Sequence, residues 1–177
     1  MDITPDCIEL IKHYESLHDG DLHKIGLQAK KDCLGIWTIG YGHALFDKQG
    51  NPLRGDANQA IADKACEGMT EADAGKLLGE DLDKFSAQLK PIIHIFCSDA
   101  MFSSCVSLAY NTGLGAFTTS TVLREMNKGN KVVAANGFLL FNKGTVNNKR
   151  IVLPGLVKRR KAERAMFLGQ DFRQFFV

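Results

Sequence analysis

The sequence predicts an α+β fold, in which a small sheet-bearing lobe is followed by a larger helical lobe. Residues 36–42 are rich in β-forming side chains and are broken by glycines, which is typical of a small, twisted antiparallel sheet. From Thr70 to the C-terminus the apolar residues instead recur at helical spacing. A chain of 177 residues suits one domain, and we expect the binding site in a cleft between its two lobes.

The N-terminal part begins with one predicted helix. Thr4 can cap this helix, and Pro5 suits its first position because that N–H would have no helical partner. The helix should end soon after Glu15, before residues 21–46, where the sheet is expected. A further short helix is predicted over residues 60–66, after several turn signals.

The C-terminal part is predicted to be helical throughout. Thr70 and Asp73 resemble a capping box, and Pro91 ends the apolar stripe that follows it. A second helix should begin at Ser98, run through Asn111 and break at residues 112–115. Shorter helices are expected near residues 119–128, 131–142 and 155–168, with a polar loop over 144–152.

Charge and composition argue against general polyanion binding, disulfide-stabilised folds and metal sites. The net charge of +2 gives no general affinity for polyanions, although residues 158–161 are basic. The five cysteines form no CxxC pair and the five histidines have no metal-ligand spacing, so we expect no disulfide framework, metal or cofactor. The first residues do not resemble a signal peptide, and no apolar run could span a membrane, so the chain should remain in the cytoplasm where it is made.

The chemistry that stands out is a set of two carboxyl groups and a hydroxyl. Hydrolysis of a glycosidic bond needs one carboxyl that donates a proton and another that stays ionised. Glu15 lies at the C-terminal end of a helix, where partial negative charge favours the protonated form. Asp32 lies in a polar turn, and Thr38, six residues later, could orient a water molecule for attack.

These residues lie within four segments that closely resemble the phage-type lysozyme (endolysin) family of muramidases. The first segment is Trp37-Thr38-Ile39-Gly40-Tyr41-Gly42-His43, with the Glu and Asp upstream. The others lie at residues 69–74, 108–117 and 153–164, in the family's order. The resemblance implies a single lysozyme-like domain over 1–177, with a small β lobe at about 16–69 and a helical lobe formed by 1–15 with 70–177.

The resemblance also implies an activity and a set of site residues. The family hydrolyses the β-1,4 bond between N-acetylmuramic acid and N-acetylglucosamine in bacterial peptidoglycan, which causes cell lysis. By motif position, Glu15 is the proton donor, and Asp32 with Thr38 activates water. The saccharide groove is implied to contain Tyr110, Asn111 and Ser120, and Arg159 or Arg160 is implied to lie behind the catalytic Glu.

The same resemblance implies the partners and the place of action. We expect a monomer that contacts peptidoglycan glycan strands and neither binds nucleic acid nor inserts stably into a membrane. It would be made in the host bacterial cytoplasm and act on the wall after release.

Two insertions distinguish this chain from the family pattern. Residues 19–26 form an eight-residue insertion, which makes Asp19 and Asp21 competing candidates for the second carboxylate. A second insertion is expected at about 46–67. Both flank the small lobe, so the shape of the groove and the details of the substrate depend on them.

Alternative functions and structural roles remain open from the sequence. A lytic transglycosylase needs only the acid, a glycan-binding protein needs neither carboxylate, and a nucleic-acid-binding helix could use residues 155–164. Trp37, Tyr41 and Phe46 are expected in the core, and His43 is expected to be a hydrogen-bonded structural residue. The sequence further places Cys97 and Cys105 on one helix.

Overall fold

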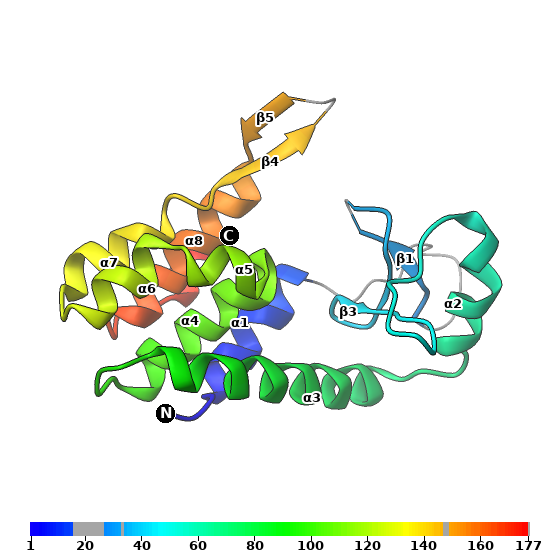
Figure 1. The fold of residues 1–177 in the computed structure, drawn as a ribbon, viewed down its shortest axis with the longest axis horizontal. Helices are drawn as coiled ribbons and strands as arrows, with labels where there is room; N and C mark the ends of the chain where they lie inside the picture. Colours follow the sequence, from blue (N-terminus) through cyan, green and yellow to red (C-terminus); the bar gives the residue numbers. More distant parts are fainter. Residues whose placement is uncertain (16–26, 33, 147–148, 177) are drawn as a thin grey trace. The chain divides into compact units, whose positions relative to one another are not determined.

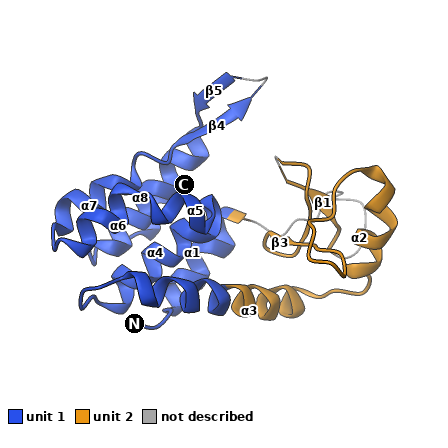
Figure 2. Cartoon of the chain, in the orientation of Figure 1, with its two compact units in different colours: residues 1–14, 82–177 blue, residues 15–81 orange. Residues whose placement is uncertain are grey.

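A computed structural model describes residues 1–15, 27–32, 34–146 and 149–176. These residues form two compact units (Figure 2). Unit 1 contains Met1–Tyr14 and Leu82–Val177, and unit 2 contains Glu15–Asp81. The predicted insertion at 19–26, with Asp19 and Asp21, lies outside the described residues, as does Cys33.

Unit 1 is built mainly from helices (Figure 1). Its core is rich in phenylalanine. Its central helix α4 (Asp99–Thr112) is buried from Met101 to Ala109 and packs against α8 (Pro154–Phe167). The other helical elements of this unit are α1 (Pro5–Glu15, up to Tyr14), the C-terminal part of α3, η2 (Lys90–Ile92), α5 (Leu114–Thr118), α6 (Thr121–Asn127), α7 (Lys131–Phe138) and η3 (Arg173–Phe175).

The predicted helix starts are confirmed by their caps. Thr4 Oγ1 accepts a hydrogen bond from the backbone N–H of Cys7, and Ser98 Oγ accepts one from that of Met101. Helix α3 (Glu71–Leu89) begins with the reciprocal bonds of the Thr70–Asp73 capping box. It runs from unit 2 into unit 1, as the change of colour along it in Figure 2 shows.

Unit 2 contains a three-stranded antiparallel sheet in the order β1-β2-β3. Its strands are β1 (Lys30–Lys31), β2 (Trp37–Ile39) and β3 (His43–Ala44). The turn η1 (Asp56–Asn58) and the short helix α2 (Gln59–Ala65) follow, the latter close to the predicted position. Trp37, Leu53 and Ala62 form the buried centre of this unit.

The structure explains why a glycine occupies position 40 of the β-rich segment. Its φ is +56°, and a Cβ there would lie 3.2 Å from the Cβ of Ala74. Glycine therefore permits both the left-handed backbone and the close approach of the sheet to α3. Strand β2 can then turn back immediately into β3.

Three local predictions were wrong. Residues 144–152 are not a polar loop: β4 (Lys143–Val146) and β5 (Lys149–Val152) pair as an antiparallel hairpin, since their β-branched residues favour extended backbone. Phe46 is 57% exposed: the preceding Leu45 packs against the buried cluster around Trp37, and successive side chains of an extended segment point to opposite faces. Cys97 is buried but precedes α4, whose cap at Ser98 starts the helix after it.

The predicted break after α4 is only partly correct. The helix includes Thr112, and the chain changes direction at Gly113 alone, whose φ is +86°. Helix α5 then begins at once with Leu114.

Among the described residues, none of the helices has the length and apolar character needed to cross a lipid bilayer.

Candidate active site

Asp32 is fixed by the turn that joins β1 to β2. Its Oδ1 accepts hydrogen bonds from the backbone N–H groups of Leu34 and Ile36, each at 2.8 Å. The backbone N–H of Asp32 donates to the Ile36 carbonyl, and Gly35 supplies the positive φ that the turn requires. In the described part of the chain Oδ2 accepts no hydrogen bond, so this oxygen can act on a ligand.

Thr38 lies on the neighbouring strand of the same sheet. It pairs with Lys30 in the β1–β2 register, and its Oγ1 donates a hydrogen bond of 2.9 Å to the Lys30 carbonyl. The residue is only 3% exposed. Because the hydroxyl hydrogen is used within the sheet, Oγ1 can serve a water molecule only through its lone pairs.

Glu15 is the last residue of α1 and is half-buried. Within unit 1 the preceding Tyr14 anchors the end of this helix, because its hydroxyl donates to the Phe175 carbonyl at 2.8 Å. Burial, with a smaller contribution from the charge of Glu163, raises the pKa of Tyr14 to about 12. The phenol therefore stays protonated and keeps its hydrogen bond at neutral pH.

A buried polar network joins α4 to α8 in unit 1, and we call it the α4–α8 network. Oε1 of Glu163 accepts from Ser107 Oγ at 2.8 Å, Arg160 Nη2 at 3.0 Å and Arg159 Nε at 3.2 Å. Arg160 Nη2 also donates to Asn111 Oδ1 at 3.0 Å. Both arginines and the glutamate are at most 3% exposed. The network thus fixes the amide orientation of Asn111.

The two other predicted groove residues lie in unit 1 and have structural partners. Tyr110 is half-buried and packs edge-on against Phe85, with ring centroids 5.6 Å apart. Ser120 is buried and caps α6, since its Oγ accepts from the Leu123 N–H at 3.1 Å. Their contact with a saccharide stays a prediction.

The chain matches the phage lysozyme family model over residues 22–163. It is 35% identical to the endolysin of Acyrthosiphon pisum secondary endosymbiont phage 1, over 94% of this chain and 98% of that protein. The chain belongs to the phage lysozyme family. It is therefore a lysozyme-type glycoside hydrolase that degrades peptidoglycan.

Solved structures confirm the lysozyme-like α+β fold. The endolysin from Escherichia coli O157:H7 phage FAHEc1 is 30% identical with a TM-score of 0.73, over 95% of this chain and 94% of that one. The muramidase domain of SpmX from Asticaccaulis excentricus is 29% identical with a TM-score of 0.72, over 94% and 97%. The family match includes Asp32 and Thr38 and begins after Glu15.

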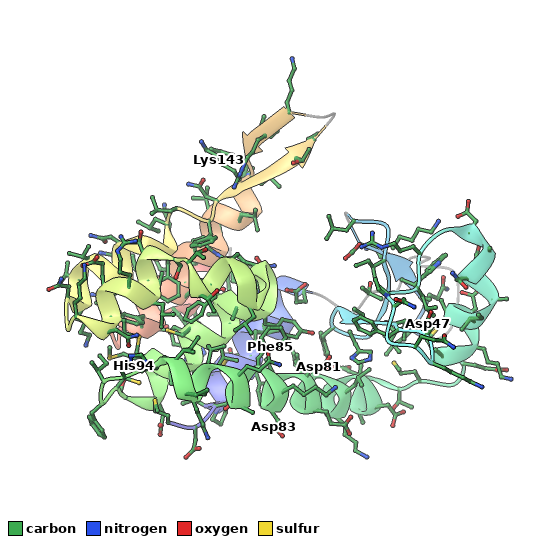
Figure 3. The ribbon with its side chains drawn as sticks, viewed as in Figure 1. Asp47, Asp81, Asp83, Phe85, His94 and Lys143 are labelled. Carbon is green, nitrogen blue, oxygen red and sulfur yellow. The ribbon has the colours of Figure 1, made fainter. Side chains whose placement is uncertain are left out.

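In this lysozyme the sheet is also tied to α3 by polar bonds that position it. His43 Nδ1 lies 2.6 Å from Asp81 Oδ2, which confirms the prediction of a hydrogen-bonded structural histidine. Tyr41 donates to Glu71 Oε1 at 3.3 Å. Figure 3 labels Asp81 on α3. These bonds attach β3, and the turn that precedes it, to the helix.

The four cysteines that the structure describes are buried free thiols. Burial raises the pKa of Cys7 to about 12 and also raises the pKa values of Cys66, Cys97 and Cys105. A thiol with a raised pKa is a poor nucleophile at neutral pH. Among the described residues, no group of histidine, cysteine and acidic side chains could hold a metal ion.

Sequence reasoning missed Asp81 and Glu163. Asp81 lies within the acidic run at residues 80–83, and its position between the buried Leu78 and Leu82 of α3 is the signal that could have marked it. Glu163 follows Arg159 and Arg160 at helical spacings of four and three residues. That spacing could have indicated an ion-paired helix face, but it does not show that the face is buried.

Proposed function

We propose that this lysozyme hydrolyses the β-1,4 bond between N-acetylmuramic acid and N-acetylglucosamine, with Glu15 as general acid and Asp32 with Thr38 activating water. The observation that carries the proposal is the placement of Asp32 and Thr38 on neighbouring segments of one sheet, within the region that matches the family. Cleavage of these bonds in the bacterial wall would cause lysis.

The hydrogen bonds of the sheet support a division of work between Asp32 and Thr38. Asp32 Oδ1 is held by two backbone donors, which leaves Oδ2 to accept a proton from water. Thr38 Oγ1 already donates to a carbonyl, so it can accept the second hydrogen of the same water. A water held through both hydrogens presents a lone pair for attack on the anomeric carbon.

Glu15 supplies the proton in this scheme. A carboxyl group at a helix end can protonate the leaving oxygen while the water attacks from the opposite face of the sugar. Such a mechanism inverts the anomeric carbon and needs roughly 6.5–9.5 Å between the two carboxyl groups. General acid catalysis of this kind contributes about 10²–10⁴-fold to the rate.

We further propose that Tyr110 and Asn111 contact the glycan, with Ser120 nearby. The orientation of Asn111, fixed by Arg160, supports its part in this groove. The protein would act as a monomer, be made in the host cytoplasm and reach the wall after release.

The test is lysis of purified cell walls by Glu15→Gln. The amide keeps the shape of the side chain but cannot donate the proton, so wall clearance should fall at least 100-fold while the fold is kept. Glu9→Gln is the matched control, because Glu9 lies on the same helix and pairs with Arg173 on the surface. Clearance by Glu15→Gln at the rate of Glu9→Gln would overturn the assignment.

Product analysis tests the second carboxylate. Hydrolysis gives a reducing end, and Asp32→Asn should abolish its formation. Anhydromuramyl ends, formed without water, would show a lytic transglycosylase and would exclude the proposed role of Asp32 and Thr38.

A further inference from the structure

The β4–β5 hairpin of unit 1, which connects α7 to α8, is exposed and basic. Every one of its described residues is exposed except the half-buried Gly144. Lys143, Lys149 and Arg150 give it three positive charges, and residues 143–152 contain no Asp or Glu. In the described part of the chain, none of these three cations forms an ion pair. In Figure 1 the hairpin stands away from the helices of its unit.

Aliphatic side chains accompany the charges along the hairpin. Val146, Ile151 and Val152 are 42%, 43% and 50% exposed. The register pairs Val146 with Lys149 and Lys143 with Val152, so each face carries a cation beside an aliphatic group. Val146 and Ile151 share one face with Lys149, whereas Val152 lies on the other face with Lys143 and Arg150.

The root of the hairpin is fixed, so this exposure belongs to a defined structure. The backbone N–H of Leu153 donates to the Asn142 carbonyl at 3.0 Å, which extends the ladder beyond the strands. A Cβ on Gly144 would lie 2.5 Å from Leu153 Cδ1, so the leucine packs directly against the glycine. Lys143 lies at this root (Figure 3). On the other strand, α8 begins at Pro154, immediately after Leu153.

We propose that the β4–β5 hairpin is a peripheral membrane-binding element, which holds the lysozyme at an anionic lipid surface. Lysine and arginine attract anionic headgroups, and each contributes roughly five-fold to partitioning. The aliphatic groups beside them can enter the boundary between headgroups and acyl chains. A soluble polyanion would use the charges but not the aliphatic groups. A second copy of this chain would bring a hairpin of the same charge, which disfavours pairing.

The experiment measures co-sedimentation of the full chain with vesicles of phosphatidylcholine and phosphatidylglycerol, and with vesicles of phosphatidylcholine alone. Binding is expected to the anionic vesicles only. The triple variant Lys143→Gln/Lys149→Gln/Arg150→Gln should bind on the order of 100-fold more weakly. A control variant removes the same charge elsewhere, through Lys48→Gln/Lys64→Gln/Lys131→Gln, and should bind nearly as well as the parent. Equal loss in both variants would overturn the proposal, because net charge alone would then explain binding.

A second variant separates a membrane from a free polyanion. Val146→Ser/Ile151→Ser keeps the charges and should weaken vesicle binding on the order of ten-fold. Unchanged binding of this variant, with loss in the charge variant, would mean a polyanion site and would contradict the membrane assignment. Both hairpin variants should digest isolated peptidoglycan, which contains no lipid, at the parental rate. This readout separates failure of the membrane proposal from failure of the proposed hydrolysis.

Discussion

Replacing Glu163 with glutamine would test how far the α4–α8 network depends on charge. Glu163 is fully buried, and its Oε1 accepts hydrogen bonds from Ser107, Arg159 and Arg160. A glutamine oxygen can still accept these bonds, so Glu163→Gln changes the charge with little change in shape. Two buried guanidinium groups then lose the negative charge between them.

The expected loss of stability is large. Removing one partner of a buried ion pair costs about 3–5 kcal/mol, because the charge that remains is no longer compensated. For a chain of this size, each 1 kcal/mol lowers the melting temperature by about 2–4 °C. Glu163→Gln should therefore melt roughly 6–20 °C below the parent.

The assay is urea unfolding followed by far-ultraviolet circular dichroism, with thermal melting as a second measurement. Glu9→Gln is the matched control, because Glu9 pairs with Arg173 and both of these side chains are exposed. Surface ion pairs contribute little. A loss below about 1 kcal/mol for Glu163→Gln, or one equal to that of the control, would refute the reasoning that charge holds this network.

Three smaller perturbations test other parts of the structure. Hydrogen bonds, chiefly from Asn130, lower the pKa of Glu125 from 4.5 to about 2. The contribution of Glu125 to stability is therefore complete above pH 4.5 and is lost as the pH falls toward 2. The difference in melting temperature between the parent and Glu125→Gln should shrink over that interval. Ser98→Ala removes the cap of α4 and should cost about 1 kcal/mol in urea unfolding, and an unchanged midpoint would mean that water replaces the cap. Gly40→Ala should cost about 1–3 kcal/mol from its positive φ, and more than Gly50→Ala, where φ is also positive but a Cβ would meet open space instead of Ala74. Equal losses would show that the close approach to α3 is unimportant.

Local signals in the sequence predicted most of the helices. Thr4, Ser98 and the Thr70–Asp73 pair mark helix starts through bonds that span only three residues, so their effect can be read from the sequence. The β-forming residues and glycines around Gly40 likewise predicted the sheet, because strand preference and tight turns are local properties of the sequence. The hairpin at 143–152 was missed, because its turn and charged residues are also typical of a polar loop.

Long-range contacts could not be predicted in the same way. Nothing in the sequence around His43 identifies Asp81, 38 positions away, as its partner. Phe46 was expected in the core because of its hydrophobicity, but its neighbour Leu45 takes the inward position and Phe46 is exposed. The roles of Glu15 and Asp32 came from the family resemblance, and the structure adds to Asp32 the turn that fixes its carboxylate.

The measurement that tests the central claim most directly is NMR of the anomeric proton at freshly released product ends, recorded during digestion of purified peptidoglycan. A water held by Asp32 and Thr38 attacks opposite the leaving group, so the first signal should be the α-anomer, which then mutarotates. Asp32→Asn, digested in parallel, should release almost no new ends. An initial signal of the β-anomer would mean that the configuration is retained, and it would contradict a mechanism in which Asp32 and Thr38 share the attacking water.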